Sequence, residues 1–510
     1  MQAPTSRRFL FRILLLCLFL TGLSLAVRSI VGESSRSTAP QQKLSPFLKR
    51  ILESPGSDSS QVLPVIVEFR DQRASRSFWE RSGQGRPLGA TAWLSGRMRG
   101  DQLSQLTRRQ DVVRISLDAP LRSFARAPAG QSPPYSLSLP FLQALDADGL
   151  QAQGWDGSGI GVAVFDSGIC RHPGLHGSIA YRADFSGPSP RFGARAPQSD
   201  LYGHGTLVAG VLAAADPSRE VRGMAPGVHL IDVRVIDGRG RGRASRLIEA
   251  IDWVIANRRR FNIRIANLSL GHAPLQHYAA DPLARAASRL VEAGIVTVAS
   301  SGNFGKTAQV ENLWGLIASP GHHPDLITVS PLNTQATATL SDDVATTYGS
   351  RGPSLTGGGL KPDLTAPGNR IPSLIDPASR LARHNPERLL REGVLEMSGA
   401  SMAVPFISGA AALLLQSNPD LDPMAVKQIL LLSARPLSQP HFFEQGSGLV
   451  HLPTALKLAE ALRAQPSVLI APDHSSGRIL GDGAIWTDGA VWTDGAVWTD
   501  SSSAIATADR

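Results

Sequence analysis

The chain has 510 residues, of which 42% are hydrophobic and 18% are charged, so it can build a large apolar core and is not a disordered polyelectrolyte. Its formal net charge is +9, and the charged residues are unevenly distributed along the chain. Residues 1–126 carry 20 Lys and Arg against 9 Asp and Glu, which leaves 31 against 33 in the remainder. Because the basic excess is confined to the leading segment, the composition argues against a nucleic-acid partner.

The first residues have the pattern of a secretory signal peptide. A positively charged N-terminal region with three arginines precedes an apolar run over residues 13–20. A cleavage signal of the small-x-small type follows and ends at Ala26. We therefore predict a signal peptide over residues 1–26 and a secreted or extracytoplasmic protein. A retained membrane anchor is the alternative, although the apolar run is short for a span. After cleavage Cys170 would be the one cysteine left, so no intrachain disulfide could form.

A small domain is predicted next. Residues 27–60 are polar and rich in Ser, Pro and Gln, which is typical of a flexible spacer. Residues 61–126 contain strand-like runs at 63–69 and 112–117, with a helix-like run at 100–109 between them. This order indicates a small α/β domain.

Between residues 127 and 463, β-rich apolar runs alternate with helical runs. The predicted strands are 160–165, 228–235, 263–270, 295–300 and 326–329, and the predicted helices are 245–257, 282–293 and 422–433. Alternating strands and helices predict an α/β fold with a parallel sheet covered by helices on both faces. Ligands of such sheets bind where strands end and helices begin.

Three residues at such positions point to nucleophilic catalysis. Ser401 opens an apolar run with Pro405 near its start, which places the hydroxyl at a helix N-terminus that favours negative charge. Asp166 follows a strand-like run, and His204 lies between two glycines ahead of small helix-forming residues. A serine needs a histidine to take its proton, and the histidine needs an anion to orient it. The chain order Asp, His, Ser is that of subtilisin.

The motifs around these residues resemble the subtilisin-like serine protease family (subtilases, peptidase S8). They read V-A-V-F-D-S-G, G-H-G-T-L-V-A-G and S-G-A-S-M-A-V-P, and a fourth, I-V-T-V-A-S-S-G-N, ends at Asn303. The resemblance implies a serine endopeptidase of subtilisin-like fold with Asp166, His204 and Ser401 as catalytic residues and the Asn303 amide as oxyanion donor. Leu207 and Phe406 depart from the usual histidines of the motifs, which puts local packing rather than proton transfer in question.

The resemblance also implies a substrate-binding strand and a specificity pocket. The residues implied are Ser269, Leu270 and Gly271 in the strand, Ser300, Ser301 and Gly302 in one pocket wall, and 318–321 in the pocket floor. These stretches contain no acidic residue, which favours an uncharged side chain before the cut. The alternative is that these segments are plain sheet core and loop.

By the same resemblance, residues 61–126 would be an inhibitory pro-domain that acts on its own chain, with the cut in an exposed linker over 122–134. An independent accessory domain is the alternative. The expected partners are protein or peptide substrates and the chain's own pro-domain, with a monomer as the default and no nucleic acid. Catalysis would need no cofactor. Structural calcium is possible, but we assign no metal ligand, although Asp200, Asp342 and Asp343 are loop acids.

The tail over residues 464–510 contains three hexapeptides of the form G-A-[IV]-W-T-D. Their Asp-Gly pairs predict two-residue hairpins between short strands, and a removable tail is equally compatible. For the whole chain we predict an autoprocessed serine endopeptidase. The alternatives are a catalytically silent scaffold and a peptide ligase that uses the same residues.

Overall fold

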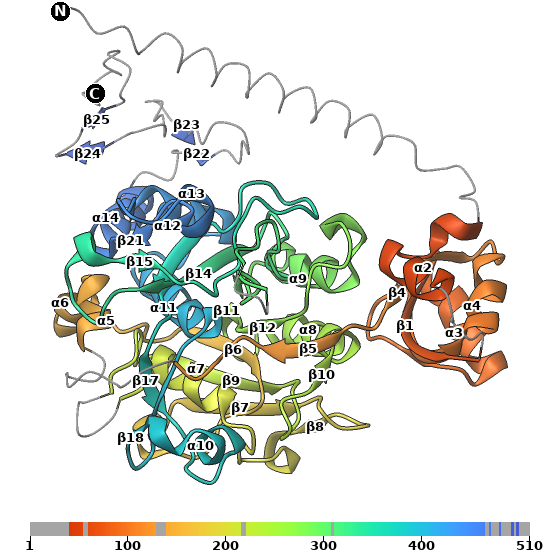
Figure 1. Ribbon diagram of the computed structural model, residues 1–510. Helices are drawn as coiled ribbons and strands as arrows, with labels where there is room; N and C mark the ends of the chain where they lie inside the picture. Colours follow the sequence, from red (N-terminus) through yellow and green to blue (C-terminus); the bar gives the residue numbers. More distant parts are fainter. Residues whose placement is uncertain are drawn as a thin grey trace, which may run out of the picture.

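The computed structural model describes residues 40–54, 60–128, 139–215, 221–307 and 311–464, together with four short strands beyond them. These four strands are β22 (Leu469–Ile470), β23 (Ile479–Leu480), β24 (Val491–Thr493) and β25 (Ala496–Trp498). A small N-terminal body lies beside a larger α/β body, and a single segment joins them (Figure 1). The predicted signal peptide lies outside the described residues.

The small body is an antiparallel sheet with helices, in the strand order β2-β3-β1-β4. Its elements are η1 (Pro40–Lys43), α2 (Pro46–Glu53), β1 (Val62–Phe69), α3 (Gln72–Ser82), β2 (Arg86–Pro87), β3 (Trp93–Arg99), α4 (Gly100–Thr107) and β4 (Val112–Leu117). Side chains alternate across a strand, and Val65 and Val67 face the core of the small body, whereas Ile66 between them packs into the larger body. The sheet therefore has its own core on one face and docks through the other.

The predicted spacer over residues 27–60 is wrong at residues 40–54, where the structure has the two helices η1 and α2. Residues 46–53 form helix α2, and Leu48 is fully buried in the core of the small body. Polar composition suggested a loop, but one apolar stripe is enough to seat a short helix on a sheet.

The larger body is built on one sheet in the order β20-β21-β16-β14-β13-β11-β6-β9-β7-β8. All pairs from β21 to β7 are parallel, and the pairs at the two ends are antiparallel. The strands are β6 (Gly161–Asp166), β7 (Ile179–Asp184), β8 (Arg191–Phe192), β9 (His229–Arg234), β11 (Ile263–Leu268), β13 (Val296–Ser300), β14 (Ile327–Asn333), β16 (Leu364–Pro367), β20 (Ala434–Arg435) and β21 (Leu449–Val450), and β15 (Val344–Ala345) pairs with β14.

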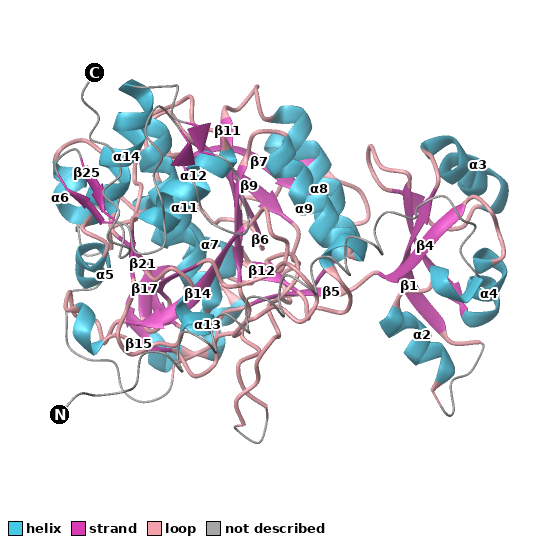
Figure 2. Cartoon of the chain, turned by 90° about the horizontal axis from the view of Figure 1, so that it is seen from above, coloured by secondary structure: helices cyan, strands magenta, loops and turns pink. Residues whose placement is uncertain are grey.

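Helices cover both faces of this sheet (Figure 2). Val162 and Val164 of β6 share a core with α7 (His204–Ala213), α11 (Ala400–Ser417), α12 (Pro423–Leu432) and α14 (Leu452–Ala464). Ala163 and Phe165 pack on the opposite face with α8 (Ala244–Asn257) and α9 (Pro282–Glu292). The predicted α/β fold, a parallel sheet with helices on both faces, is confirmed.

Smaller elements surround this framework. They are α5 (Leu139–Ala144), α6 (Ala147–Ala152), η2 (Pro173–Leu175), η3 (Gly193–Arg195), η4 (Tyr278–Ala280), η5 (Leu340–Asp342), α10 (Arg380–His384), η6 (Pro386–Arg388) and α13 (Phe442–Gln445). An antiparallel sheet consists of β17 (Ile371–Leu374), β19 (Val394–Met397) and β18 (Leu389–Arg391), and two residues separate the end of β19 from α11. This sheet therefore fixes where α11 begins.

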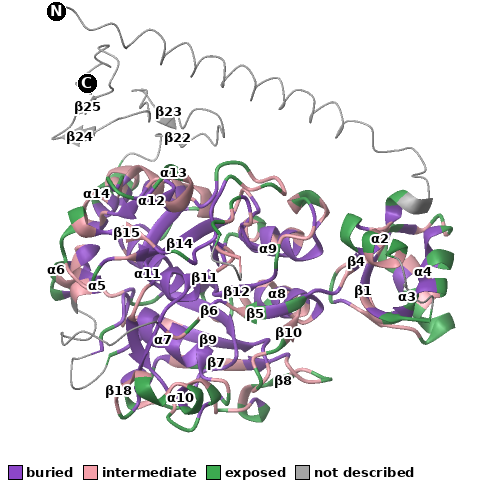
Figure 3. Ribbon diagram, viewed as in Figure 1, coloured by how far each residue is buried: buried purple, intermediate pink, exposed green. Residues whose placement is uncertain are grey.

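Helix α11 is the centre of the larger body (Figure 3). Among the described residues it is the one helix that is long and apolar enough to cross a membrane by length and composition, and 94% of its apolar window is buried inside the protein. Its hydrophobicity is thus used in the core.

The segment that joins the two bodies is not the exposed linker that its composition suggests. β5 (Pro120–Ser123) forms an antiparallel sheet with β10 (Gly242–Arg243) on one side and β12 (Leu270–Gly271) on the other. Leu121 and Phe124 are buried, at 1% and 5% exposed. Their apolar side chains hold the segment against the larger body.

In the tail, β24 and β25 pair antiparallel, with Thr493 opposite Ala496. This register matches the predicted two-residue hairpin between consecutive W-T-D repeats. The first repeat lies outside the described residues.

Candidate active site

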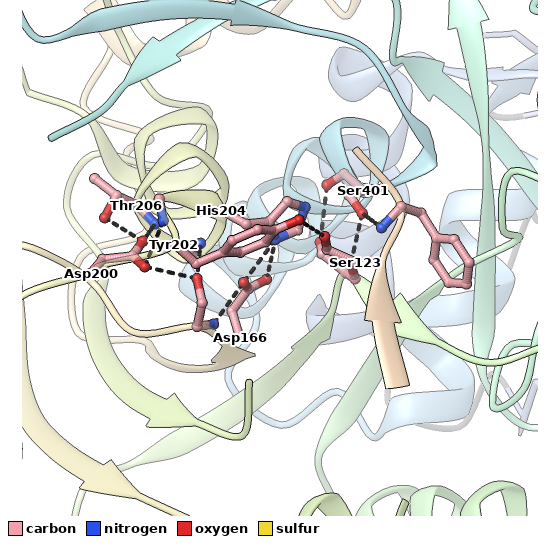
Figure 4. A network of polar contacts seen from close by, with 12 residues as sticks. Ser123, Asp166, Asp200, Tyr202, His204, Thr206 and Ser401 are labelled. Carbon is pink, nitrogen blue, oxygen red and sulfur yellow. Dashed lines mark hydrogen bonds and ion pairs between the residues drawn. The ribbon is translucent and has the colours of Figure 1, made fainter. Parts of the chain in front are cut away.

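An aspartate and a histidine meet at the end of the central strand (Figure 4). Asp166 is the last residue of β6, and His204 is the first residue of α7. The Nδ1 of His204 lies 2.7 Å from Oδ1 and 2.8 Å from Oδ2 of Asp166, and both side chains are buried. A carboxylate in this position fixes the tautomer with Nδ1–H, which leaves Nε2 free to accept a proton.

Ser401 is the second residue of α11, the neighbour of α7. Pro405 lies inside this helix and has no N–H, so the carbonyl of Ser401, four residues earlier, lacks its usual helical donor. The hydroxyl of Ser269 donates to this carbonyl at 3.0 Å, and Asn267 in turn donates to the Ser269 hydroxyl at 3.0 Å. The start of the helix is thereby tied to the end of β11.

The Ser401 hydroxyl is turned toward the joining segment. It donates to the Ser269 carbonyl at 2.7 Å and accepts from the N–H of Phe124 at 2.8 Å. The Nε2 of His204 is buried, and no described residue gives it a hydrogen bond. Proton transfer between the two side chains therefore requires the hydroxyl to leave Ser269 and turn toward Nε2.

The carbonyl oxygen of Phe124 lies between two donors. The Nδ2 of Asn303 donates to it at 2.7 Å, and the backbone N–H of Ser401 points to it at 3.5 Å. The Oδ1 of Asn303 accepts from the N–H of Ala400 at 3.0 Å, which orients the amide. This is the geometry that stabilises an oxyanion as it forms on a carbonyl.

The joining segment runs through the site as an extended strand. Ser123 pairs with Leu270, and Arg122 pairs with Gly271, in antiparallel register. Beyond Phe124, Arg126 forms an antiparallel bridge with Ser398. The strand is thus held on both sides of the Phe124–Ala125 peptide bond.

The Phe124 side chain occupies an apolar pocket. It packs with Ala318, Ala400 and Phe304, and its ring meets that of Phe304 edge to face at 5.6 Å between centroids. A hydrogen bond of 2.8 Å from Ala318 N–H to the Ser301 carbonyl holds this floor to the end of β13. An uncharged occupant agrees with the absence of acidic residues in the stretches named from the sequence.

The structure places the predicted subsite residues in two groups. Leu270 and Gly271 contact the segment through the backbone, whereas Ser269 acts on Ser401. Ser300, Ser301 and Gly302 stay beside the pocket, and Ser300 caps the N–H of Gly302 at 3.1 Å. Sequence reasoning missed Phe304, which the S-S-G-N motif directly precedes.

Asp200, named only as a loop acid, organises the loop before His204. Its carboxylate is fully buried and accepts hydrogen bonds from Gly203 N–H, from the N–H and hydroxyl of Thr206, and from the Ser167 hydroxyl, at 2.8–2.9 Å. Burial raises the pKa of Asp200, and the nearby charge of Asp166 adds to this shift. The residues beside Asp166 and His204 thus share one anchor.

The described residues do not gather three or more His, Cys, Asp or Glu side chains into a place that could hold a metal ion. Asp200 uses its oxygens in the hydrogen bonds above, and Asp342 accepts from Thr337 at 3.0 Å. The buried Asp363 is paired with Lys361 at 2.5 Å and Lys427 at 3.2 Å. Both carboxylate oxygens of Asp343 are buried without a hydrogen-bond partner among the described residues. Structural calcium stays a prediction without an assigned ligand.

Cys170 is buried at 4% exposed, and burial raises the pKa of its thiol to about 11, so Cys170 is a small core side chain. His322 and His323 lie in a turn and are both buried, at 0% and 8% exposed. They directly follow the pocket-floor residues 318–321, and their backbone N–H groups donate to the carbonyls of Ala318 and Pro320, both at 3.0 Å.

Together, a doubly covered parallel sheet and an Asp-His pair beside a helix-start serine define the class of α/β serine hydrolases with an oxyanion hole. Residues 157–448 match the model of the Subtilase family (Peptidase_S8). The chain belongs to this family of serine peptidases.

Individual relatives agree with this assignment. The chain is 39% identical over 285 residues to serine protease AprX of Bacillus subtilis, an alignment that covers 54% of this chain and 61% of AprX. It is 32% identical over 323 residues to subtilisin E of the same organism, which covers 63% of this chain and 72% of subtilisin E.

Among solved structures, the fold is similar to fervidolysin from Fervidobacterium pennivorans, with a TM-score of 0.62 and 20% identity over 81% of this chain and 62% of that one. At this identity the likeness concerns the fold alone.

Proposed function

We propose that the protein is a secreted endopeptidase of the subtilisin type, made as a zymogen that cuts itself between Phe124 and Ala125. The observation that carries the proposal is the position of the Phe124 carbonyl, whose oxygen accepts from Asn303 and Ser401 N–H while Ser401 Oγ contacts the same residue. No other bond of the described joining segment is placed in this way.

The site residues then divide the reaction among them. Ser401 Oγ attacks the carbonyl carbon while Nε2 of His204 takes its proton, and Asp166 holds Nδ1–H and stabilises the imidazolium. Asn303 and the Ser401 N–H stabilise the oxyanion. His204 returns the proton to the Ala125 amine, which leaves, and water then hydrolyses the ester between Ser401 and Phe124 in a second, equivalent cycle.

Contacts across the interface support an inhibitory role for the small domain. Arg285 of α9 binds Glu68 through two hydrogen bonds of 2.8 and 2.9 Å, and its guanidinium lies 5.1 Å from the Trp93 ring centroid. Arg86 binds Glu249 of α8 in the same two-pronged way. The domain therefore positions the joining segment in the site, and the same contacts would keep the segment there after the cut.

The remaining features of the proposal follow from the sequence. The leader supports secretion, and a cut after Phe124 would place the domain boundary two residues before the predicted one, at residue 126. Substrates would be proteins or peptides with an uncharged side chain before the cut, because Phe124 fills an apolar pocket. Catalysis needs no cofactor in this scheme, and we keep the monomer as the working state.

The test compares the intact mass of the purified wild-type protein with that of Ser401→Ala. Loss of the residues before Ala125 in the wild type alone would support a self-processing protease. Equal trimming of both proteins would assign maturation to another enzyme. If neither is trimmed and neither cleaves a peptide, a silent scaffold replaces our proposal. Adding an amine nucleophile to the peptide assay separates hydrolysis from ligation.

A further inference from the structure

We propose that the enzyme selects an arginine at the second position after the cut, in a subsite formed by the face of the Tyr348 ring and the backbone of Ser398. This inference rests on the proposed function, because it takes the joining segment as the enzyme's first substrate. It adds a specificity on the leaving-group side, where the apolar pocket has no influence.

The backbone contacts fix which residue reaches this subsite. The N–H of Arg126 donates to the Ser398 carbonyl at 2.7 Å, and the N–H of Ser398 donates to the Arg126 carbonyl at 2.9 Å. Because Asn303 holds the Phe124 carbonyl, this register places only the second residue after the Phe124–Ala125 bond in the subsite. Successive side chains of an extended segment point to opposite sides, so Ala125 does not compete for this place.

The ring offers a fixed face to the cation. The Cζ of Arg126 lies 5.0 Å from the Tyr348 ring centroid. Tyr348 is only 8% exposed, and its hydroxyl donates to the Gly368 carbonyl at 2.8 Å, so the polar end of the side chain is already used. A substrate side chain can therefore contact the face of the Tyr348 ring, which is immobilised and carries the negative part of the ring quadrupole.

The backbone of Ser398, which pairs with Arg126, is equally well held. The Ser398 hydroxyl donates to Oδ1 of Asn369 at 3.2 Å and accepts from the N–H of Arg370 at 2.9 Å. These bonds keep the Ser398 backbone extended for pairing. Because neither the ring nor the Ser398 backbone has to reorganise on binding, the subsite can discriminate between side chains.

Electrostatics then favour a guanidinium. A cation within about 6 Å of an aromatic centroid is attracted by the ring quadrupole, with about 0.5–1 kcal/mol at exposed sites. Arg126 is exposed, so the value for exposed sites applies. This attraction corresponds to a change of about 2- to 5-fold in kcat/KM. A planar, weakly hydrated guanidinium stacks better than an ammonium, which predicts Arg above Lys, both above a neutral aliphatic side chain, and Glu lowest.

The experiment measures kcat/KM of the matured wild-type enzyme on quenched peptides with the core Leu-Arg-Ser-Phe-Ala-Xaa, in which Xaa is Arg, Lys, Leu or Glu. The same series is run with Tyr348→Leu, which removes the ring, and with Tyr348→Phe, which keeps the ring and loses the hydroxyl. The four combinations of Arg or Leu in the peptide and Tyr or Leu in the enzyme form a double-mutant cycle.

We expect a 2- to 5-fold preference for Arg over Leu that Tyr348→Phe retains and Tyr348→Leu abolishes. Equal rates for Arg and Leu in the wild type would overturn the inference while the proposed protease stands, and so would a preference that survives Tyr348→Leu. If Tyr348→Leu does not fold, the wild-type and Tyr348→Phe series still decide. If the wild type cleaves none of the peptides, the proposed function fails first.

Discussion

Gly399 shows how closely a substrate must approach this site. Its φ of 146° lies in a region that side chains avoid, and a Cβ there would come within 1.8 Å of the Phe124 carbonyl oxygen. A glycine immediately before the helix is therefore required for the carbonyl to reach both donors. The cost of filling this space would fall on substrate binding rather than on the core.

Asn303 allows the most direct test at the level of one residue. Asn303→Leu removes the side-chain donor, and we expect kcat to fall about 10²- to 10³-fold with little change in KM, because the hydrogen bond matters most in the transition state. This range is the one established for the equivalent asparagine of a subtilisin. Steady-state kinetics on one peptide, with precursor accumulation as a second readout, measure it.

An unchanged kcat for Asn303→Leu would contradict the oxyanion assignment. A rise in KM alone would show that Asn303 holds the substrate without favouring the transition state. The matched comparison is Asn312→Leu, which changes the same residue type at an exposed position of the same loop.

At the scale of single elements, the turn behind the specificity pocket contains a buried histidine. Burial lowers the pKa of His322 to about 4, although Asp281 at 3.8 Å opposes the shift. His323 is lowered to about 4 for the same reason. Between pH 4 and 6.5 the unfolded chain therefore binds protons that the folded chain does not bind. The free energy of unfolding thus increases as the pH rises through this window and decreases as the pH falls through it.

We expect His322→Gln to reduce this pH dependence by about one proton, which is about 1.4 kcal/mol per pH unit. Denaturant unfolding of the uncleavable Ser401→Ala chain, measured from pH 4.5 to 7.5 with and without the second substitution, tests the expectation. Parallel curves for the two proteins would show that the pKa of His322 is the same in the folded and the unfolded chain, which would contradict the expectation.

Whether an element could be predicted from the sequence depends on how that element is stabilised. Helix α8 and strand β4 appear close to where they were expected, because periodic apolar residues encode them. Strand β5 was missed, since it pairs through only two residues on each side and depends on partners more than a hundred residues away. Helix α2 was missed because its apolar stripe lies within a polar composition.

The candidate site divides in the same way. Asp166, His204, Ser401 and Asn303 stand in motifs that a single sequence displays. Tyr348 and Phe304 act through three-dimensional proximity. Tyr348 lies in none of the motifs, and Phe304 lies one residue beyond the motif that ends at Asn303. Asp200 was noticed four residues before His204, but its hydrogen bonds to Ser167 and Thr206 depend on the folded loop.

For the whole molecule, the docking of the small domain controls access to the joining segment. The Glu68–Arg285 pair is partly shielded, with side chains 17% and 34% exposed. Glu68→Gln in the Ser401→Ala chain should weaken docking by about 1–2 kcal/mol, because one charge loses its partner. We therefore expect trypsin to cut at Arg122 or Arg126 about 5- to 30-fold faster than in the parent.

The matched control is Asp101→Asn, which breaks the surface pair of Asp101 and Arg99 away from the interface and alters no trypsin site. Peptide masses identify the bonds that are cut. Equal rates at the joining segment in Glu68→Gln and Asp101→Asn would mean that the ion pair does not hold the domain in place.

The N-terminal residue of the earliest processed product, identified at low conversion before secondary trimming, shows which bond the enzyme cuts first. We expect Ala125 in the wild type and no cut in Ser401→Ala. A first cut at any other bond, or the same cut in Ser401→Ala, would contradict the claim that the joining segment lies in the site as its first substrate.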